Sequence, residues 1–321
     1  MRNVQMRILI TGGAGCLGSN LIEYWLPQGH EILVIDNFAT GKREVLPEVE
    51  GLTVVEGSIA DAELVKNSFK QFQPTHVIHS AASYKDPNDW EEDALTNVIG
   101  TINVAKAAMQ YDIERFVNFQ TALCYGRPTV LPIPISHSTA PFTSYGISKT
   151  AGEAYLMQAK LPVISLRLAN ICGPRLAIGP IPTFYKRLKS GQGCFCSDTI
   201  RDFLDMNDFF SFMNFVMSKD NAYGVFNVST GEGHSIKDVY DAVAHYLSIT
   251  PPDVPIVPAG EDDVPVVVLD PGETCEQLGW HAEVSFEETI NNQLKWYDKY
   301  GVTDIFSHLA VGKTEKEGKS E

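Results

Sequence analysis

The sequence predicts an α/β fold in which a doubly wound parallel sheet is followed by a smaller C-terminal α/β cap. Three observations predict it: short apolar runs alternate with helical segments, a glycine-rich turn follows the first run, and the alternation loosens after Ala169. Strands this apolar are buried on both faces, as in a parallel sheet. Alternating strand and helix units of this size imply right-handed crossovers.

The strands expected in the first half are short and apolar. They span Arg7–Thr11, Glu31–Ile35, Thr53–Val55, Thr75–Ser80, Arg115–Thr121 and Val163–Ala169. The helices expected between them span Cys16–Pro27, Asp61–Gln71, Asp89–Gln110 and Tyr145–Ala159. In the first of these helices, Leu17, Leu21 and Trp25 fall on one stripe, which is the spacing of a helix packed against a core.

The second half begins with loops marked by Gly173-Pro174 and by Gly179-Pro180. The elements expected there are a helix near Thr183–Ser190, a strand near Val225–Val228, an irregular stretch at Pro251–Pro265, and helices at Ile236–Leu247 and Ser285–Tyr300. The tail from Val311 is mostly Lys, Glu, Gly and Ser, a composition typical of disorder. We therefore divide the chain into residues 1–169, residues 170–310 and a disordered tail at 311–321.

The charge and composition of the chain argue against nucleic-acid-binding and membrane-spanning proteins. The 321 residues carry a net charge of −15, and after residue 250 there are 15 acidic and five basic residues. A field of that sign repels phosphate backbones, which disfavours nucleic-acid binding. No run of 18 apolar residues occurs, so we expect no membrane span.

Cysteine usage points to reduced thiols. Of the six cysteines, only Cys194 and Cys196 lie close together, and a C-x-C pair lacks the second ligand pair of a zinc site. We therefore expect no metal site. The first residues read as a strand entering a glycine turn rather than as a signal peptide, so we expect a cytoplasmic protein.

A glycine-rich turn indicates a dinucleotide site. Gly12, Gly15 and Gly18 form a G-x-x-G-x-x-G pattern that leaves a strand and opens a helix. Glycine lets the backbone approach a pyrophosphate, which sits on the helix N-terminus, as in a Rossmann-type domain. The next strand ends in Asp36, whose carboxylate would bind ribose hydroxyls and repel a 2′-phosphate. The pattern therefore favours NAD over NADP, bound to residues 1–169.

A Y-x-x-x-K pair supplies the candidate chemistry. Tyr145 and Lys149 are four residues apart on an expected helix, so their side chains share one face. A nearby ammonium and a positive nicotinamide both favour phenolate, so we expect the tyrosine pKa to fall. Such a tyrosine can take a proton from a hydroxyl group.

A second Y-x-x-x-K pair, Tyr185 and Lys189, has no hydroxyl residue at a strand end upstream. Tyr145 has Thr121, at the carboxyl end of a strand, where ligands of open α/β sheets bind. We therefore predict Thr121, Tyr145 and Lys149 as the catalytic set. Tyr185 and Lys189 are interpreted as surface or lining residues.

With these motifs the chain resembles the extended short-chain dehydrogenases/reductases, in the NAD-dependent nucleotide-sugar epimerase/dehydratase group that includes UDP-glucose 4-epimerase. The resemblance covers residues 6–300. It also rests on Asp36-Asn37-Phe38-Ala39-Thr40-Gly41, His79-Ser80-Ala81-Ala82, Asn97 before Gly100-Thr101, Tyr125-Gly126, Leu166-Arg167-Leu168-Ala169-Asn170 before Gly173-Pro174-Arg175, Arg201-Asp202-Phe203 and Leu278-Gly279-Trp280.

The resemblance implies a role for each matching residue. Tyr145 would be the acid/base, Lys149 would hold the nicotinamide ribose, and Thr121 would bind the reacting oxygen. Residues 170–310 would mainly bind the nucleotide sugar, and Asn97 and His79 would be structural. The residues expected to contact NAD are Gly12, Gly15, Cys16, Leu17, Gly18, Asp36, Asn37, Phe38, Thr40, Gly41, Ser58, Ile59, Ser80, Ala81, Ala82, Tyr145 and Lys149. Those expected to contact substrate are Tyr84, Lys85, Thr121, Asn170 and Arg201.

Departures from the family pattern refine the expectation. Ala122 and Leu123 stand where dehydratases carry an acidic residue, which disfavours dehydration. Ser58 stands where many relatives have an aspartate that contacts adenine. The run from Pro258 to Asp263 lacks the arginine with which relatives bind a phosphate. The cations that could compensate are Lys186, Arg187 and Lys189.

The leading hypothesis is NAD-dependent epimerisation of a nucleotide-activated sugar through a transient keto sugar. The resemblance favours a UDP-linked sugar, inversion at C4 and a place in cell-surface polysaccharide synthesis, including lipopolysaccharide O-antigen. It also implies a homodimer in which Asp89–Gln110 and Tyr145–Ala159 of two chains form a four-helix bundle. Two alternatives stay open: a keto-sugar reductase with exchanging NAD(H), and a non-catalytic NAD(H)-binding sensor.

Overall fold

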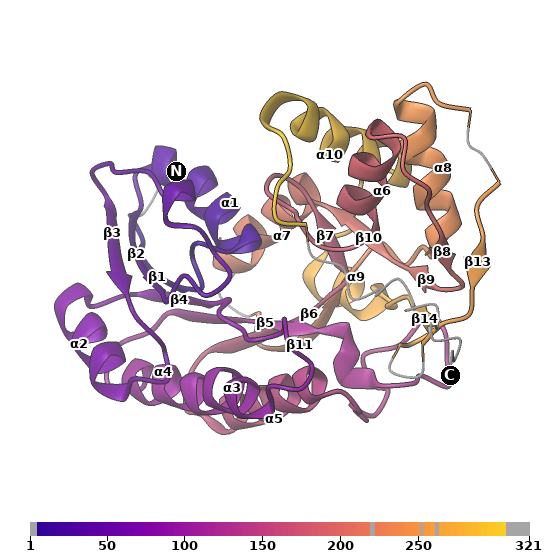
Figure 1. The fold of residues 1–321 in the computed structure, drawn as a ribbon. Coiled ribbons are helices and arrows are strands. Elements are labelled where there is room, and N and C mark those ends of the chain that lie inside the picture. Colours follow the sequence, from indigo (N-terminus) through magenta and orange to yellow (C-terminus); the bar gives the residue numbers. More distant parts are fainter. Residues whose placement is uncertain (1–4, 219–221, 251–252, 261–262, 306–321) are drawn as a thin grey trace, which may run out of the picture.

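A parallel sheet in the order β11-β6-β5-β4-β1-β2-β3 forms the main body of the computed structural model, which describes residues 5–218, 222–250, 253–260 and 263–305 (Figure 1). The strands are β1 (Arg7–Thr11), β2 (Glu31–Asp36), β3 (Leu52–Glu56), β4 (His76–His79), β5 (Arg115–Thr121), β6 (Val163–Leu168) and β11 (Gly224–Val228). Every pairing between them is parallel. The doubly wound α/β prediction is confirmed. The strand order reverses between β1 and β4, which places ligand binding at the carboxyl ends of these strands.

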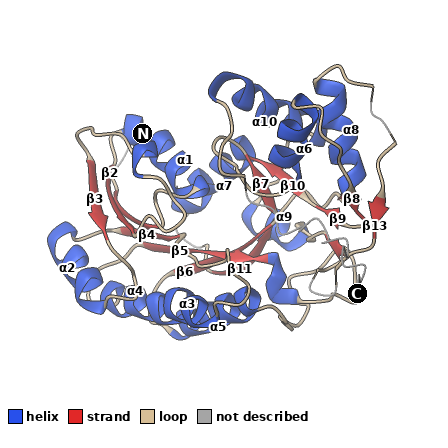
Figure 2. Ribbon diagram, viewed as in Figure 1, coloured by secondary structure: helices blue, strands red, loops and turns tan. Residues whose placement is uncertain are grey.

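Helices cover both faces of the sheet, because its strands are apolar on both sides (Figure 2). In β1, Ile8 and Ile10 belong to the core under one set of helices, and Leu9 belongs to the core under the other. The first set is α1 (Cys16–Trp25) and α7 (Met206–Ser218). The second set includes α2 (Ala62–Phe72), α4 (Thr101–Ala108) and α5 (Ser144–Gln158). Short 3₁₀ turns follow α1, β2 and β5 as η1 (Leu26–Gln28), η2 (Arg43–Val45) and η4 (Ala122–Tyr125).

Two helical regions differ from the prediction. The single helix expected at Asp89–Gln110 consists of α3 (Trp90–Asp93), the π-helix η3 (Ala94–Gly100) and α4. The helix α7 was not predicted at all. Phe209, Phe212 and Met213 are fully buried, whereas Asn207, Ser211, Asn214 and Ser218 recur at helical spacing on the more exposed side. This period was readable from the sequence, and the prediction overlooked it.

The cap is built from helices and from short strands that sequence patterns do not reveal. Its helices α6 (Pro180–Lys189), α8 (Ile236–Tyr246) and α10 (Phe286–Tyr300) share a core that includes Phe184, Tyr240 and Leu294. Helix α9 (Gly272–Leu278) packs against β11 of the main sheet. The strands are β7 (Asn170–Cys172) with β10 (Phe203–Asp205), β8 (Cys196–Ser197) with β13 (Ile256–Val257), and β9 (Ile200–Arg201) with β12 (His234–Ser235) and β14 (Val266–Val267). Strand β13 lies in the stretch expected to be irregular.

The chain crosses between the two parts more than once. After the first strands and helices of the cap it returns to the main sheet, where β11 pairs with β6. The division at residue 169 therefore separates the two parts along the sequence only approximately. The tail expected at 311–321 lies outside the described residues.

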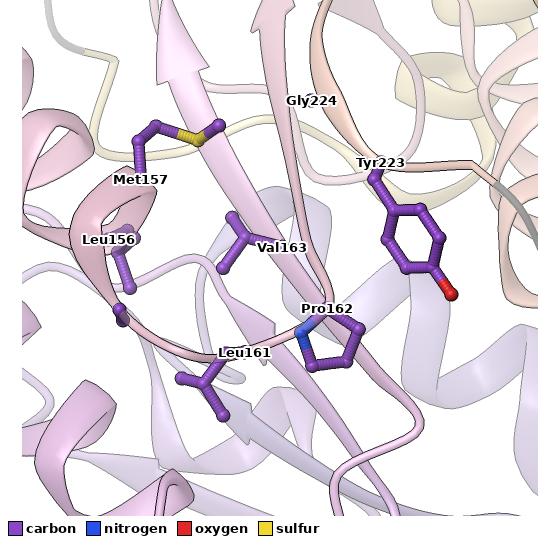
Figure 3. A pocket seen from close by; sticks show the side chains of 8 residues that line it. Leu156, Met157, Leu161, Pro162, Val163, Tyr223 and Gly224 are labelled. Atoms are coloured by element: carbon purple, nitrogen blue, oxygen red, sulfur yellow. The ribbon is translucent and has the colours of Figure 1, made fainter.

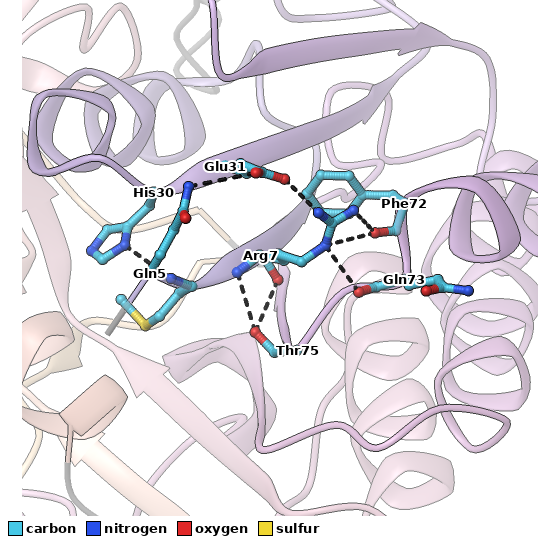
Figure 4. Close-up of polar contacts among 8 residues, drawn as sticks. Gln5, Arg7, His30, Glu31, Phe72, Gln73 and Thr75 are labelled. Atoms are coloured by element: carbon cyan, nitrogen blue, oxygen red, sulfur yellow. Dashed lines mark hydrogen bonds and ion pairs between the residues drawn. The ribbon is translucent and has the colours of Figure 1, made fainter. Parts of the chain in front are cut away.

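Polar contacts tie the amino ends of the strands together, opposite the ligand-binding edge. The Arg7 guanidinium donates to the Phe72 carbonyl and pairs with Glu31 at 2.5 Å (Figure 4). The Arg7 amide donates to the Thr75 hydroxyl at 3.2 Å. These contacts link β1 to β2 and to the end of α2.

Two features are absent from the described parts of the chain. No helix there is long and apolar enough to cross a membrane. No group of three or more His, Cys, Asp or Glu side chains there is arranged to hold a metal ion.

Candidate active site

The glycine turn has no room for side chains. Gly12 has φ +70°, and a Cβ placed on it would lie 2.7 Å from the Ala81 Cα; one on Gly18 would lie 2.6 Å from the Gly12 carbonyl oxygen. No side chain caps the N-terminus of α1, so its first amides are left for an anionic ligand. The turn therefore fits the pyrophosphate of a dinucleotide. Leu17 follows in the first turn of the helix.

Asp36 holds two loops in place. Its buried carboxylate accepts hydrogen bonds from the amides of Ala14 and Phe38, each at 2.8 Å. These bonds join the glycine turn to the loop of Asn37, Phe38, Thr40 and Gly41. Gly41 packs on Ala14 so closely that a Cβ there would lie 2.7 Å from the Ala14 carbonyl carbon. A carboxylate has about four acceptor positions, so Asp36 can still bind a ribose hydroxyl.

The other residues predicted to line the cofactor also lie at the carboxyl ends of strands. Ser58 follows β3, and its hydroxyl accepts from the Ala60 amide at 3.1 Å. Ile59 is buried against Gly100, and Asn103 donates to the Ile59 carbonyl at 3.1 Å. After β4, the Ala81 amide donates to the Thr11 hydroxyl at 3.2 Å, which fixes the Ser80–Ala82 turn beside Gly12.

Gln120 joins two of the three predicted catalytic residues, Thr121 and Lys149, and sequence reasoning missed it. Its side-chain oxygen accepts from the Thr121 amide at 2.7 Å, and its amide nitrogen donates to the Lys149 carbonyl at 3.0 Å. This buried side chain therefore holds the end of β5 against α5, which carries Tyr145. The Thr121 hydroxyl accepts from the Leu123 amide at 3.1 Å, so its own proton remains available for donation.

The electrostatics of Tyr145 differ from the expectation. Burial raises the pKa of Tyr145 above its ordinary value, and the nearby Tyr84 and Asp93 raise it further. The predicted fall in the tyrosine pKa is therefore wrong for the protein groups alone. Burial also lowers the pKa of Lys149 to about 8, against an opposing effect of Glu153. Desolvation outweighs the favourable pairing that the Y-x-x-x-K spacing suggested.

A buried ion pair between Arg167 and Glu153 lies near Lys149. Arg167 and Glu153 pair at 2.8 Å with both side chains largely buried, and Ser165 donates to Glu153 at 2.6 Å. Glu153 lies one helical turn after Lys149, so its negative charge favours the ammonium form of the lysine. The Arg167 guanidinium also lies over the Tyr125 ring, 4.8 Å from its centroid.

Asn97 and His79 have structural partners, as the resemblance implied. The Asn97 side chain accepts from the Ser83 amide and donates to the Ser83 carbonyl, each at 2.9 Å, and donates to the Ser148 hydroxyl at 3.0 Å. His79 contacts the hydroxyls of Thr11 and Thr101, each at 2.8 Å. Burial lowers the pKa of His79 to about 3, with Lys149 adding to the effect. A histidine held neutral in this way is not a proton shuttle at neutral pH.

The predicted substrate residues Asn170 and Arg201 come together in the cap. Asn170 donates from its side chain to the Asp202 carbonyl at 2.9 Å, directly after Arg201 in the chain. The Arg201 guanidinium pairs with Asp263 at 2.6 Å and donates to the Ile200 carbonyl at 2.8 Å. Burial lowers the pKa of Arg201. A cation partly buried with a single carboxylate is a candidate ligand for a diphosphate.

The remaining predicted cations lie elsewhere. Lys85 is exposed. The second Y-x-x-x-K pair is occupied within the cap: Lys189 donates to the Tyr185 hydroxyl at 2.9 Å, and both contact Asp298. Arg187 donates to the Gly193 carbonyl at 2.6 Å. Lys189 is exposed, which agrees with its interpretation as a surface residue. Tyr185 is buried in the cap core, so the same interpretation is wrong for Tyr185.

A pocket of about 560 Å³ lies away from these residues (Figure 3). It is lined mainly by Leu156, Leu161, Pro162, Val163 and Tyr223. Val163 begins β6 and Gly224, also in the lining, begins β11. The pocket is therefore at the amino ends of the strands, opposite the edge that carries Thr121 and Asp36.

The cysteines agree with the expectation of free thiols. All six are unpaired. Cys16, at the start of α1, is directed to the Pro174 carbonyl at 3.4 Å, and burial raises the pKa of its thiol to about 12, with Arg175 opposing. It is therefore not a reactive thiolate.

Comparisons with known proteins agree with this geometry. The model of the NAD dependent epimerase/dehydratase family matches residues 8–229. The chain belongs to this family. A crystal structure of the Bordetella bronchiseptica enzyme WbmG with NAD is 69% identical, with a TM-score of 0.92, over 96% of this chain and 99% of that one. WbmH of the same organism, crystallised with NAD⁺, is 41% identical, with a TM-score of 0.87, over 93% of this chain and 100% of that one.

A relative with a named activity extends the comparison. The UDP-glucose 4-epimerase of Mycolicibacterium smegmatis is 30% identical over 91% of this chain and 98% of its own. Membership of the family confirms the predictions of an NAD-dependent epimerase and of NAD as its cofactor. The assignments of individual site residues stay predictions.

Proposed function

We propose that this enzyme inverts C4 of a UDP-linked sugar, with Thr121, Tyr145 and Lys149 as its catalytic residues. One observation carries the proposal: Gln120 bonds the backbones of Thr121 and Lys149, which assembles a proton-transfer set beside a glycine turn that fits a dinucleotide. Support for the nucleotide comes from WbmG, which has also been crystallised with NAD and UDP. The UDP-glucose 4-epimerases among the relatives support inversion at C4.

The chemistry needs one base, one hydrogen-bond donor and a two-electron acceptor. NAD, when bound, supplies the acceptor and later returns the same two electrons to the opposite face of the carbon. Tyr145 removes the proton of the C4 hydroxyl as that carbon becomes a ketone, and gives the proton back when the carbon is reduced. The Thr121 hydroxyl donates to the reacting oxygen, and the Lys149 ammonium stabilises the phenolate. The net reaction is an inversion with no net oxidation.

The residues after Thr121 favour epimerisation over dehydration. Eliminating water from the sugar needs a second acid or base beside the hydroxyl residue. Ala122 is buried and apolar, and Leu123 packs in the same apolar cluster. Neither can transfer a proton, so the keto sugar would keep its C6 oxygen.

The cap would hold the nucleotide end of the substrate. Asn170 donates to the carbonyl of Asp202, the residue after Arg201, and we assign Asn170 and Arg201 to the diphosphate. In this assignment the diphosphate replaces or shares the contact with Asp263. The product would supply the synthesis of a cell-surface polysaccharide such as O-antigen; this destination rests on the family resemblance alone.

The functional unit would be a homodimer. Helices η3 and α5 pack closely because Gly152 has no side chain: a Cβ there would lie 2.4 Å from the Asn97 carbonyl oxygen. Their outer side carries exposed Leu95 (40%), Ile99 (44%), Ile147 (51%) and Tyr155 (55%). Such a run of exposed apolar side chains on paired helices fits a four-helix bundle between two chains.

NMR spectroscopy of UDP- and dTDP-hexoses incubated with the protein in D₂O tests the proposed activity. We expect C4 inversion of a UDP-sugar without deuterium at C4, and loss of at least a hundredfold in rate for Tyr145→Phe, on the order of a general acid–base contribution. Deuterium at C5 with a 4-keto-6-deoxy product would contradict the proposal in favour of dehydration. Stoichiometric change at 340 nm with added cofactor would contradict it in favour of a reductase.

A further inference from the structure

Strand β12 places His234 directly beside Arg201. The two residues are partners in the antiparallel pairing of β12 with β9, and Val267 of β14 is the parallel partner of Arg201 on its other side. Directly paired residues of neighbouring strands direct their side chains to the same face of a sheet, with Cβ atoms about 4.5–5.5 Å apart. His234 is therefore the polar neighbour of Arg201 in this three-stranded sheet, and Val267 is the apolar one.

The backbone that presents His234 is fixed by the residues after it. Ser235 is the N-cap of α8: its hydroxyl accepts from the Asp238 amide at 3.0 Å, and the Asp238 carboxylate accepts from the Ser235 amide at 2.8 Å. The next amide, that of Ile236, donates to the Thr199 carbonyl, directly before β9, at 3.1 Å. His234 is thus carried by a strand and a capped helix rather than by a free loop.

The His234 ring is held by an aromatic partner but is not enclosed. It stacks on Phe286, the first residue of α10, with centroids 3.8 Å apart and an angle of 9° between the rings. Phe286 in turn lies 5.8 Å from the ring of Phe203, which follows Arg201 on the same side of the chain. The His234 side chain is 25% exposed and that of Arg201 is 17% exposed, so a ligand can reach both.

A diphosphate bound to Arg201 would need a further donor. Asp263 pairs with the Arg201 guanidinium at 2.6 Å, so the protein already balances part of the positive charge there. The cap cations Arg187 and Lys189 are bonded to other groups within the cap. His234 lies next to Arg201, and an imidazole ring carries an N–H donor in both of its charge states.

We propose that His234 is a substrate-binding residue that donates a hydrogen bond to the diphosphate held by Arg201. The inference rests on the proposed function, in which Arg201 binds that diphosphate. Because the two side chains leave neighbouring strands on the same face, they can bind different oxygens of one diphosphate. Stacking on Phe286 orients the ring, while Glu232, 4.0 Å from Nε2, lies at one of its nitrogen atoms.

Calorimetry of UDP binding to the NAD-loaded protein tests the contact. His234→Phe keeps a ring that can stack on Phe286 but has no donor, and we expect it to weaken UDP binding about tenfold, the worth of a hydrogen bond to a charged group. Uridine, measured by competition with UDP, lacks the diphosphate and should bind the wild type and His234→Phe equally. His245→Phe, at an exposed histidine of α8, is the matched control and should bind UDP as the wild type does.

Two outcomes of this comparison would overturn the inference. Unchanged UDP affinity in His234→Phe would show that the ring makes no contact with the diphosphate. Equal losses for UDP and uridine would show that the ring contacts the nucleoside instead. His234→Gln regains a side-chain donor and should bind UDP more tightly than His234→Phe does; equal or weaker binding would contradict a hydrogen bond from this position.

Arg201→Gln separates the inference from the proposed function. Unchanged UDP affinity in Arg201→Gln would contradict the assignment of Arg201 to the diphosphate, and with it the proposed substrate site. Loss of affinity in Arg201→Gln together with unchanged affinity in His234→Phe would overturn the inference alone. If the wild type prefers dTDP to UDP, the UDP part of the proposed function fails, and the same comparison of His234 variants on dTDP decides the inference.

Discussion

Tyr145 is surrounded by groups that oppose its ionisation. Burial, Tyr84 and Asp93 all raise its pKa, whereas the supporting Lys149 has a pKa lowered to about 8. The protein groups by themselves therefore keep the tyrosine protonated. Phenolate formation would then depend on added positive charge near the ring, such as NAD would carry on its nicotinamide. This dependence would couple proton removal to the presence of the cofactor.

Asp93, one of the groups that raise the pKa of Tyr145, is itself buried. Its carboxylate is 1% exposed, Oδ2 accepts from the Ser144 hydroxyl at 2.7 Å, and Oδ1 has no hydrogen-bond partner among the described residues. The charge thus lies at the first turn of α5, one residue from Tyr145. It favours the N-terminus of that helix and disfavours the phenolate.

Asp93→Asn should lower the Tyr145 pKa, because it removes the negative charge and can keep the bond to Ser144. The rising limb of kcat/KM against pH would then move to lower pH by several tenths to about one unit. Ser144→Ala, which removes the bond and keeps the charge, serves as the control and should not move the limb in that direction. A limb that stays in place or moves to higher pH in Asp93→Asn would contradict the assignment.

Strand β4 carries a histidine at each end, and both are buried. Burial lowers the pKa of His76 to about 4, with Arg115 and His30 adding, and that of His79 to about 3. The Thr101 hydroxyl donates to the Asn97 carbonyl at 2.7 Å, so it accepts from the Nε2–H of His79. The Nδ1 atom is then left to accept from Thr11. These bonds fit the neutral ring and leave no place for a second proton.

We expect β4 to make the fold sensitive to acid. Both histidines have folded pKa values below the unfolded value of 6.5, so the stability they add is fully present above pH 6.5 and is lost as the pH falls toward 4 and then 3. Each histidine adds a slope of about 1.4 kcal/mol per pH unit in that window. Thermal or urea unfolding between pH 7 and pH 4 measures the slope.

Variants assign this slope to particular residues. His79→Gln and His76→Asn should each flatten the dependence of unfolding free energy on pH, even where they lower stability at pH 7. His281→Asn is the matched control, because that histidine is largely exposed and should leave the slope unchanged. Equal slopes in all variants would show that other groups cause the acid sensitivity.

The whole molecule is held together by contacts between the two parts of the chain. Asn20 on α1 donates to the Pro174 carbonyl at 2.8 Å, and Arg175 donates to Asn20 at 3.2 Å and pairs with Glu23. The helix that would bind the pyrophosphate therefore also anchors the loop that leads into the cap. Residues of α1 would therefore connect the cofactor site to the position of the cap.

A charge on the outer side of η3 and α5 should separate the proposed dimer. Ile147→Glu would place a carboxylate within the apolar contact, and buried charges without partners are costly. We expect light scattering at micromolar concentration to give twice the chain mass for the wild type and the single-chain mass for Ile147→Glu. Val130→Glu, at a similarly exposed apolar residue outside these helices, should remain a dimer. A monomeric wild type would contradict the proposal.

The sequence by itself determined the features that depend on local patterns. Apolar strands such as Arg7–Thr11 and Arg115–Thr121, predicted with the bounds they have, follow from burial on both faces of a parallel sheet. The glycine turn and the Tyr145–Lys149 spacing follow from backbone geometry within a few residues. The short cap strands escaped prediction because runs of two or three residues carry no period, whereas helix α7 has a polar stripe that the prediction overlooked.

Only the tertiary structure decided the features that depend on residues far apart in the chain. The Gln120 bond to Lys149, the Asp36 link between two loops and the edge-on contact of the Tyr84 and Tyr145 rings each join different elements. The raised pKa of Tyr145 depends on burial, which the spacing to Lys149 cannot show. Desolvation and long-range contacts arise only when the chain packs, so the spacing of residues along the sequence does not predict them.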